Sequence, residues 1–104
     1  MPKINYIDWE ETSNKPGVYV IQIGDHRYIG STSRKIKVRI REHIRLLINN
    51  KHYNLKMQCL FNSETTINIS VLENCSIEIW KKEQYYINQY IPDLNIVKHV
   101  AKYK

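Results

Sequence analysis

The chain has 104 residues, of which 42% are hydrophobic and 25% are charged, and its net charge is +6 with a pI of about 9.4. This length suits one compact domain, residues 1–104, and the hydrophobic content excludes a disordered chain. The surplus of Lys and Arg favours an anionic partner such as a nucleic acid, although charge alone does not identify it.

The sequence contains neither a long apolar segment nor a signal peptide. No run approaches the roughly 18 apolar residues of a membrane span, and the N-terminus MPKINYIDWEET lacks an apolar core. We therefore expect an intracellular protein without membrane contact. Its cysteines, Cys59 and Cys75, are expected to be reduced and partly buried. A zinc site made from these with His43 and His52 is disfavoured, because the close spacing of zinc ligands is missing.

The first predicted element is a β-hairpin. Residues 1–15 are mostly polar and precede the turn signal Pro16-Gly17, so we treat them as an N-terminal extension. Residues 18–23 and 26–30 are rich in β-branched and aromatic side chains and flank Gly24-Asp25. Two such runs around a two-residue loop that begins with Gly predict two strands joined by a primed turn.

Helical periodicity begins after the hairpin. The spacing predicts a helix over residues 34–49 with its N-cap among residues 31–33, and a short second helix over residues 54–61. The apolar side chains that define the first helix are Ile36, Ile40, Ile44, Leu47 and Ile48. In the second helix, the side chains expected to face inward are Leu55, Cys59 and Leu60.

A strand and a last helix complete the pattern. Residues 66–72 alternate apolar and polar side chains, which predicts a third strand, and residues 76–90 are expected to be helical. Pro92 should stop that helix, because the residue before a proline avoids the helical conformation. Residues 97–104 are expected to form a basic surface tail.

The hairpin places two tyrosines on one face. Closing it on its two-residue turn sets Ile21 opposite Tyr28 and Tyr19 opposite Gly30, so Tyr19 and Tyr28 become diagonal neighbours. Gly30 is expected to leave an open space beside Tyr19. Tyrosine is also an ordinary strand residue, so the pair has a purely structural interpretation as well.

Arg39 and His43 stand four residues apart, beside the apolar face of the first helix. An arginine there can bind a phosphate and a histidine can move or orient a proton, although both residues also suit a solvated helix face. The other basic side chains that we expect to contact phosphates are Lys35, Lys37, Arg41, Arg45 and Lys56.

Glu83 falls inside an apolar stripe of the last helix. Its neighbours on that face are Trp80, Tyr86, Ile87 and Tyr90. A buried carboxylate needs a cation, a hydrogen-bond network or a metal ion to offset its desolvation. Alternatively, Glu83 leans to the edge of the stripe and pairs with Lys82 or with the tail.

Together these residues resemble the GIY-YIG nuclease family over residues 16–96. The motifs that carry the resemblance, in chain order, are Gly17-Val18-Tyr19, Tyr28-Ile29-Gly30, the Arg-x-x-x-His pair Arg39 and His43, Glu83, and Asn95 in the loop that follows. Val18 replaces the isoleucine of the family name. His52 resembles a second histidine of some homing-endonuclease members, although a surface position in its loop is the default for such a residue.

The resemblance implies an α/β (α+β) fold, with a three-stranded antiparallel sheet that includes the N-terminal hairpin and is flanked by helices. It also implies phosphodiester hydrolysis with one divalent cation, Mg²⁺ or Mn²⁺, held by Glu83. Arg39 would stabilise the added negative charge. Tyr19 would act as general base with the help of His43, and Tyr28 would orient the network. Gly17, Gly30, Asn95 and His52 would support the site.

The partner implied by the resemblance is DNA. Cleavage of both strands would require a homodimer or two successive nicks, and specificity would require a partner protein or a longer chain. The same family occurs in homing, restriction and repair enzymes, so a viral or phage origin is compatible with the sequence. The alternative function is a catalytically silent nucleic-acid-binding module on the same scaffold.

Overall fold

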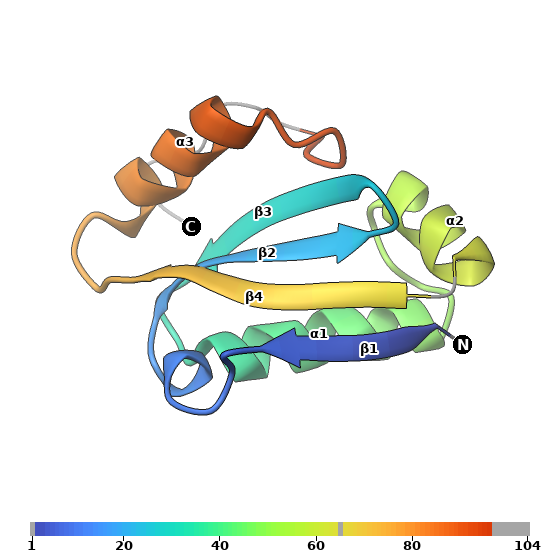
Figure 1. The fold of residues 1–104 in the computed structure, drawn as a ribbon, viewed down its shortest axis with the longest axis horizontal. Coiled ribbons are helices and arrows are strands. Elements are labelled where there is room, and N and C mark those ends of the chain that lie inside the picture. The colour runs from blue at the N-terminus through green and yellow to red at the C-terminus, as the bar shows by residue number, and fades with distance from the viewer. Residues whose placement is uncertain (1, 65, 97–104) are drawn as a thin grey trace.

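A mixed four-stranded β-sheet forms the centre of the molecule in a computed structural model that describes residues 2–64 and 66–96 (Figure 1). The strands are β1 (Lys3–Ile7), β2 (Gly17–Ile23), β3 (His26–Thr32) and β4 (Thr66–Asn74), in the spatial order β1-β4-β2-β3. The helices are α1 (Ile36–Ile48), α2 (Leu55–Ser63) and α3 (Ile79–Tyr90), and the short 3-10 helix η1 (Thr12–Asn14) precedes β2. None of the helices in the described ranges combines the length and the apolar character that a membrane crossing requires.

The sheet corrects the expected three-stranded antiparallel arrangement. Residues assigned to an N-terminal extension supply a fourth strand, β1, which pairs in parallel with β4 and sets Ile4 beside Ile67. Ile4 is partly buried against the core. A parallel partner must lie far away in the sequence, so the local pattern of a short polar segment could not reveal this pairing.

The predicted hairpin is confirmed in register. Ile23 pairs with His26 and Tyr19 pairs with Gly30. β2 also pairs with β4 on its other side, which makes it a central strand, while β3 is an edge strand. Because β2 is covered on both faces, its valine and isoleucine side chains are mostly buried.

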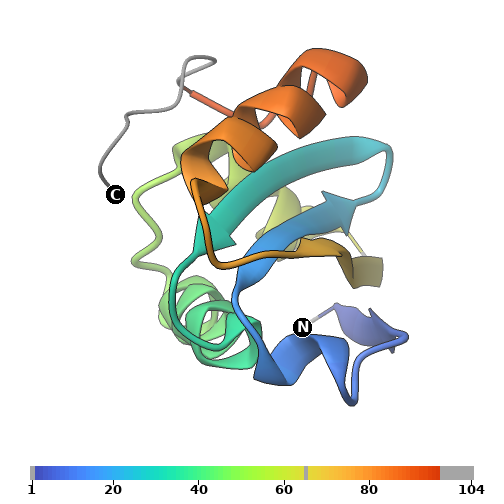
Figure 2. The ribbon, with the colours of Figure 1, turned by 90° about the vertical axis from the view of Figure 1, so that its left-hand side faces the viewer.

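Helices cover both faces of the sheet. Figures 1 and 2 show α3 beside β3, on the side away from α1. Between the sheet and helices α1 and α2 lies the main apolar core, to which Ile21, Ile40 and Met57 belong. On the α3 face a smaller cluster forms around Val18, Ile29 and Ile87. Alternate residues of β2 therefore serve opposite layers, as strand geometry requires.

Helix boundaries deviate where the backbone conformation overrides side-chain periodicity. α1 begins after Lys35, whose backbone is extended and which makes no side-chain cap, so the expected cap among residues 31–33 is wrong. α3 begins three residues later than predicted, because Glu78 adopts a left-handed conformation with φ of 48°. It ends at Tyr90 as expected, and Ile91 is also left-handed.

The inward face of α2 was predicted correctly at Leu60, which packs against the core, and wrongly at two other positions. Leu55 is 74% exposed and Cys59 is exposed, whereas Met57 and Phe61 are buried. The side chain of Asn54 accepts a hydrogen bond from the Met57 amide and so fixes where the helix begins and which face turns inward. Cys75, the other cysteine, is partly buried as expected.

Gly17→Ala tests the close approach at the start of β2. Gly17 has φ of 153°, and a Cβ there would lie 2.1 Å from the carbonyl oxygen of Glu73 on β4. We expect the substitution to lower the free energy of unfolding by roughly 2–4 kcal/mol, because backbone must move. Urea denaturation measures the loss. In the matched control Gly24→Ala, the new methyl group meets only the flexible Glu64 side chain, so the loss should be near 1 kcal/mol. Equal losses in both variants would contradict the steric explanation.

Candidate active site

Tyr19 lies directly over its cross-strand neighbour Gly30. A Cβ at Gly30 would come within 2.5 Å of the Tyr19 hydroxyl oxygen, so the space expected to be open is filled by the phenol itself. Gly30 is needed because the ring lies flat across the strand. Tyr19 is only 1% exposed, and Tyr28, on the same face, is partly buried. The shared face of the two tyrosines is thus confirmed.

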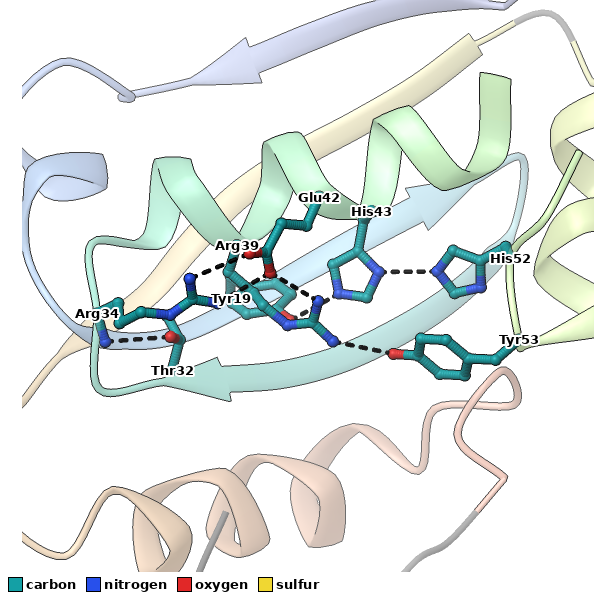
Figure 3. Close-up of polar contacts among 8 residues, drawn as sticks. All are labelled: Tyr19, Thr32, Arg34, Arg39, Glu42, His43, His52 and Tyr53. Atoms are coloured by element: carbon teal, nitrogen blue, oxygen red, sulfur yellow. Dashed lines mark hydrogen bonds and ion pairs between the residues drawn. The ribbon is translucent and has the colours of Figure 1, made fainter. Parts of the chain in front are cut away.

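His43 on α1 is hydrogen-bonded to the Tyr19 hydroxyl group. Its Nε2 lies 2.9 Å from the Tyr19 oxygen, and its Nδ1 lies 2.8 Å from Nε2 of His52 (Figure 3). His43 is fully buried rather than bordering the core. A continuous line of polar atoms therefore runs from the tyrosine on β2, through α1, to the segment before α2.

His52 is buried, so the surface position that its loop suggested is wrong. It is only 3% exposed. Its backbone N–H donates to the side-chain oxygen of Gln58 over 3.1 Å, and its Nδ1 accepts from the backbone N–H of Asn54 over 3.0 Å. Gln58 in turn donates to the carbonyl of Leu47 at the end of α1. These bonds hold the loop against the core. Periodic patterns in the sequence do not indicate such bonds, so the burial of His52 was not predicted.

Arg39 reaches the same region from α1, where two side chains hold its guanidinium. It donates to Glu42 over 3.2 Å and to the hydroxyl of Tyr53 over 3.1 Å (Figure 3). Glu42 also accepts two bonds from Arg34, at 3.0 and 2.8 Å. The hydrogen bonds from Arg34, together with its charge and that of Arg39, lower the pKa of Glu42 to about 2. One carboxylate thus bridges two arginines.

Glu83 comes to the site from the opposite layer. It is only 3% exposed on α3, and Ser31 at the end of β3 donates its hydroxyl hydrogen to the Glu83 carboxylate. Lys82, one of the two alternative partners expected for Glu83, binds Glu73 over 3.2 Å. The other alternative, the basic tail of residues 97–104, lies outside the described residues. Ser31 therefore supplies a hydrogen bond of the kind that a buried carboxylate requires.

A cavity of about 590 Å³ connects these groups at the open end of β3. Tyr19, Tyr28 and Arg39 line it from one layer, and residues 76–80, which lead into α3, line it from the other. Ser31 and Thr32 at the end of β3, with Ser33 and Arg34 directly after it, also line the cavity. The lining therefore combines hydroxyl, phenol and guanidinium groups and the Glu78 carboxylate with the apolar side chains of Ile79 and Trp80.

The sequence model of the GIY-YIG catalytic domain matches residues 15–95, which is most of the chain. The protein belongs to the GIY-YIG family. Comparison with curated proteins found no match.

Solved structures agree with this assignment. The catalytic domain of the homing endonuclease I-TevI superposes with a TM-score of 0.71 and 26% identity, covering 80% of this chain and 99% of that one. A glutamate-to-alanine variant of the I-TevI catalytic domain superposes with the same TM-score of 0.71 at 25% identity, covering 83% and 97% of the two chains. This GIY-YIG chain therefore has the fold of a homing-endonuclease catalytic domain.

In this GIY-YIG chain, Asn95 braces the edge strand rather than pointing into the cavity. Its side chain accepts from the backbone N–H of Ile29 over 2.9 Å and donates to the carbonyl of Ile29 over 2.8 Å. Asp93 and Leu94 bind the backbone of Arg27 in the same way. The segment after α3 thus covers the middle of the β3 edge and leaves its end free for the cavity.

The residues fit a single hard cation held by few protein ligands. Glu83 supplies one carboxylate beside the cavity, and the described residues contain no cluster of three His, Cys, Asp or Glu that could enclose a metal. Mg²⁺ commonly uses one or two carboxylates together with substrate phosphates and water. The donor set therefore suits a cation that binds with a phosphate substrate.

The surroundings of Tyr19 and Tyr28 raise the pKa of both phenols. Burial raises the pKa of Tyr19 far above its ordinary value, and the positive charge of Arg39 opposes that shift. Burial, followed by the nearby Tyr19, likewise raises the pKa of Tyr28. The charge of Glu83 adds to both increases, so Glu83 and the two phenols share one electrostatic environment although they come from different layers.

The predicted phosphate-binding residues are spread over the surface outside the cavity. Lys35, Arg41 and Arg45 are exposed along α1, and Lys37 is partly exposed. Lys56 pairs with Asp93 over 3.4 Å, which offsets its charge. The cations that line the cavity are instead Arg34 and Arg39.

Sequence reasoning missed four residues of this site: Ser31, Arg34, Glu42 and Tyr53. Glu42 could have been found, because it stands three residues after Arg39 on one helix, where opposite charges meet. The contacts of Ser31 and Tyr53 depend on how separate elements pack, and no local spacing indicates them.

His52 should make the stability of the fold depend on pH. Its burial, followed by the charge of Arg39, lowers its pKa from 6.5 to about 4, so the folded chain favours neutral His52. The unfolded chain binds more protons between these values, and stability should therefore fall as pH drops from 6.5 to 4, by roughly 2–3 kcal/mol. Thermal unfolding across this range, compared with His52→Gln, measures the effect. Parallel curves for the two proteins would rule out His52 as the source.

Proposed function

We propose that this chain is a metal-dependent DNA endonuclease that hydrolyses phosphodiester bonds. The observation that carries the proposal is the cavity at the end of β3, which Tyr19 and Arg39 line from one layer. Ser31 also lines this cavity, and its hydroxyl group donates to Glu83 of the other layer. A phenol, a guanidinium and a nearby carboxylate are groups that phosphodiester hydrolysis uses. The similarity to the I-TevI catalytic domain supports the same reaction class.

Arg39 is the residue that would bind the scissile phosphate. Its guanidinium lies at the cavity with a side chain that is only 25% exposed, so its charge is less screened than that of a surface arginine. A phosphate would compete with Glu42 and Tyr53 for its N–H groups. Arg39 would then stabilise negative charge that develops on the phosphate oxygens.

Tyr19 is the residue that would take the proton from the attacking water. Its oxygen lies at the cavity and is held by His43 over 2.9 Å, so its position is fixed before the substrate arrives. Because burial raises its pKa, the phenolate needs added positive charge, and Arg39 supplies such a charge. Tyr28, whose ring meets His43 edge-on at 5.6 Å, would maintain the packing of this network.

Glu83 is the residue that would hold the divalent cation, Mg²⁺ or Mn²⁺, and Ser31 fixes the orientation of its carboxylate. When bound, such a cation stabilises charge on a phosphate oxygen and on the leaving oxygen.

Plasmid cleavage tests the proposal. Supercoiled DNA incubated with the protein and Mg²⁺ should be nicked or linearised, and either Tyr19→Phe or Glu83→Gln should slow the reaction by at least about 100-fold. The matched controls Tyr85→Phe and Glu11→Gln replace exposed residues of the same types that do not line the cavity, and these variants should cut normally.

The products also separate the remaining alternatives. Linear product in the first turnover would indicate two active sites acting together, as in a homodimer, whereas nicked product would indicate a single site. If the wild type binds DNA but leaves it intact with Mg²⁺ and with Mn²⁺, the chain is a silent binding module and the endonuclease proposal is wrong.

Glu42→Gln tests whether Arg34 and Arg39 bind phosphate. The substitution removes the charge that bridges the two arginines but keeps the shape of the side chain. We expect a short DNA duplex to bind roughly 3–10-fold more tightly at fixed salt, because phosphate no longer competes with a carboxylate. Fluorescence anisotropy measures the affinity, with Glu11→Gln as the control for one lost charge elsewhere. Unchanged or weaker binding would show that neither arginine contacts DNA.

A further inference from the structure

The hydrogen bonds through His52 and His43 have a fixed direction. A backbone N–H can only donate, and the N–H of Asn54 points at Nδ1 of His52 over 3.0 Å. Nδ1 of His52 must therefore be without a proton. A neutral imidazole carries its single proton on the other nitrogen, so Nε2 of His52 is a donor.

That proton determines the next two bonds. Nε2 of His52 donates to Nδ1 of His43 over 2.8 Å, which leaves His43 with its own proton on Nε2. Nε2 of His43 in turn faces the Tyr19 oxygen over 2.9 Å. We propose that His52 is a positioning residue that fixes His43 as a hydrogen-bond donor to Tyr19, so that His43 stabilises the Tyr19 phenolate and does not accept its proton.

The surroundings make this direction hard to reverse. All three rings are buried, so bulk water does not compete for their nitrogen and oxygen atoms. The donor at the start of the chain is held too, because the Asn54 side chain accepts from the Met57 amide and donates to the carbonyl of Leu94. Reversal would place an N–H of His52 against the N–H of Asn54.

The neutral state of His52 is also favoured by its neighbours. Its ring stacks on Tyr53 with centroids 4.4 Å apart, and Arg39, which binds Tyr53, disfavours a second positive charge. The hydrogen-bond partners of its two ring nitrogens within residues 2–64 and 66–96 are His43 and the Asn54 N–H, neither of which is a carboxylate that would form an ion pair with an imidazolium. His52 therefore has one proton to donate over the pH range in which proteins normally work.

This inference deepens the proposed function, on which its catalytic consequence rests. If Tyr19 is the base, its O–H bond breaks toward the cavity and the proton passes to water there, since His43 Nε2 is already occupied. The phenolate then keeps the hydrogen bond from His43 and accepts a proton from the attacking water. In this order His43 lowers the energy of the phenolate without changing its own protonation.

Nitrogen NMR on protein labelled with ¹⁵N-histidine tests the direction without reference to DNA cleavage. At neutral pH, His43 and His52 should each show a protonated Nε2 and an unprotonated Nδ1, which the ¹⁵N shifts distinguish. Assignment follows from the loss of each signal in a single substitution. A protonated Nδ1 on His43, or an imidazolium at either residue at neutral pH, would overturn the proposal.

Two substitutions of similar shape then test the consequence. His52→Gln retains an N–H group near the position of Nε2, whereas the ionised carboxylate of His52→Glu can only accept and should move the His43 proton to Nδ1. We expect plasmid cleavage by the Gln variant to be at least about ten times faster than by the Glu variant, with the change in His43 visible by NMR. Equal rates, or faster cleavage by the Glu variant, would show that His43 acts as an acceptor.

The outcomes separate this inference from the proposed function. If the wild type does not cut DNA, the endonuclease proposal fails, yet the NMR spectra still decide which way His43 donates. If neither variant folds, the wild-type spectra give the same decision. Cleavage by the wild type together with a protonated Nδ1 on His43 would retain the endonuclease and reject the direction proposed for the network.

Discussion

The contact of Tyr19 with Gly30 is the constraint on which the site depends. A side chain at position 30 would occupy the place of the Tyr19 hydroxyl group, so the phenol could not lie across β3 and its oxygen could not reach His43. Everything further along the network follows from this placement, because His43 is positioned by Tyr19 on one side and by His52 on the other. A residue without a side chain thus determines where a functional oxygen stands.

Burial of that phenol has opposing effects. It fixes the oxygen and excludes water, but it also raises the pKa of Tyr19, with Arg39 as the opposing charge. Arg39 is itself shared with Glu42 and Tyr53, so in the DNA-free chain part of its charge is already offset. A phosphate that takes Arg39 from Glu42 would bring negative charge of its own, which a cation at Glu83 would balance. In the proposed reaction, Arg39 and a metal ion would together offset the desolvation of a single hydroxyl group.

The sequence predicted those parts of the site that depend on local geometry. The two-residue turn determines the register of the hairpin, and the register alone puts Tyr19 opposite Gly30. Helical spacing likewise places Arg39 and His43 on one face. The burial of His52 was missed because it depends on Gln58 and Asn54, which fold the loop by side-chain bonds that have no period. β1 was missed for a related reason, since five elements (η1, β2, β3, α1 and α2) separate it in the chain from its partner β4.

The position of β3 at the edge of the sheet explains how two layers can share one cavity. On a central strand, groups above and below the sheet would be separated by further strands, and Arg39 on α1 could not share a cavity with residues that lead into α3. Edge strands must be protected from pairing with other chains, and here the segment around Asn95 covers the middle of β3 with its backbone and side-chain bonds. The bonds of this segment to β3 reach Ile29, and Ser31, two residues further along the strand, lines the cavity. β1 extends the sheet at the opposite edge, so the fourth strand is added away from the cavity.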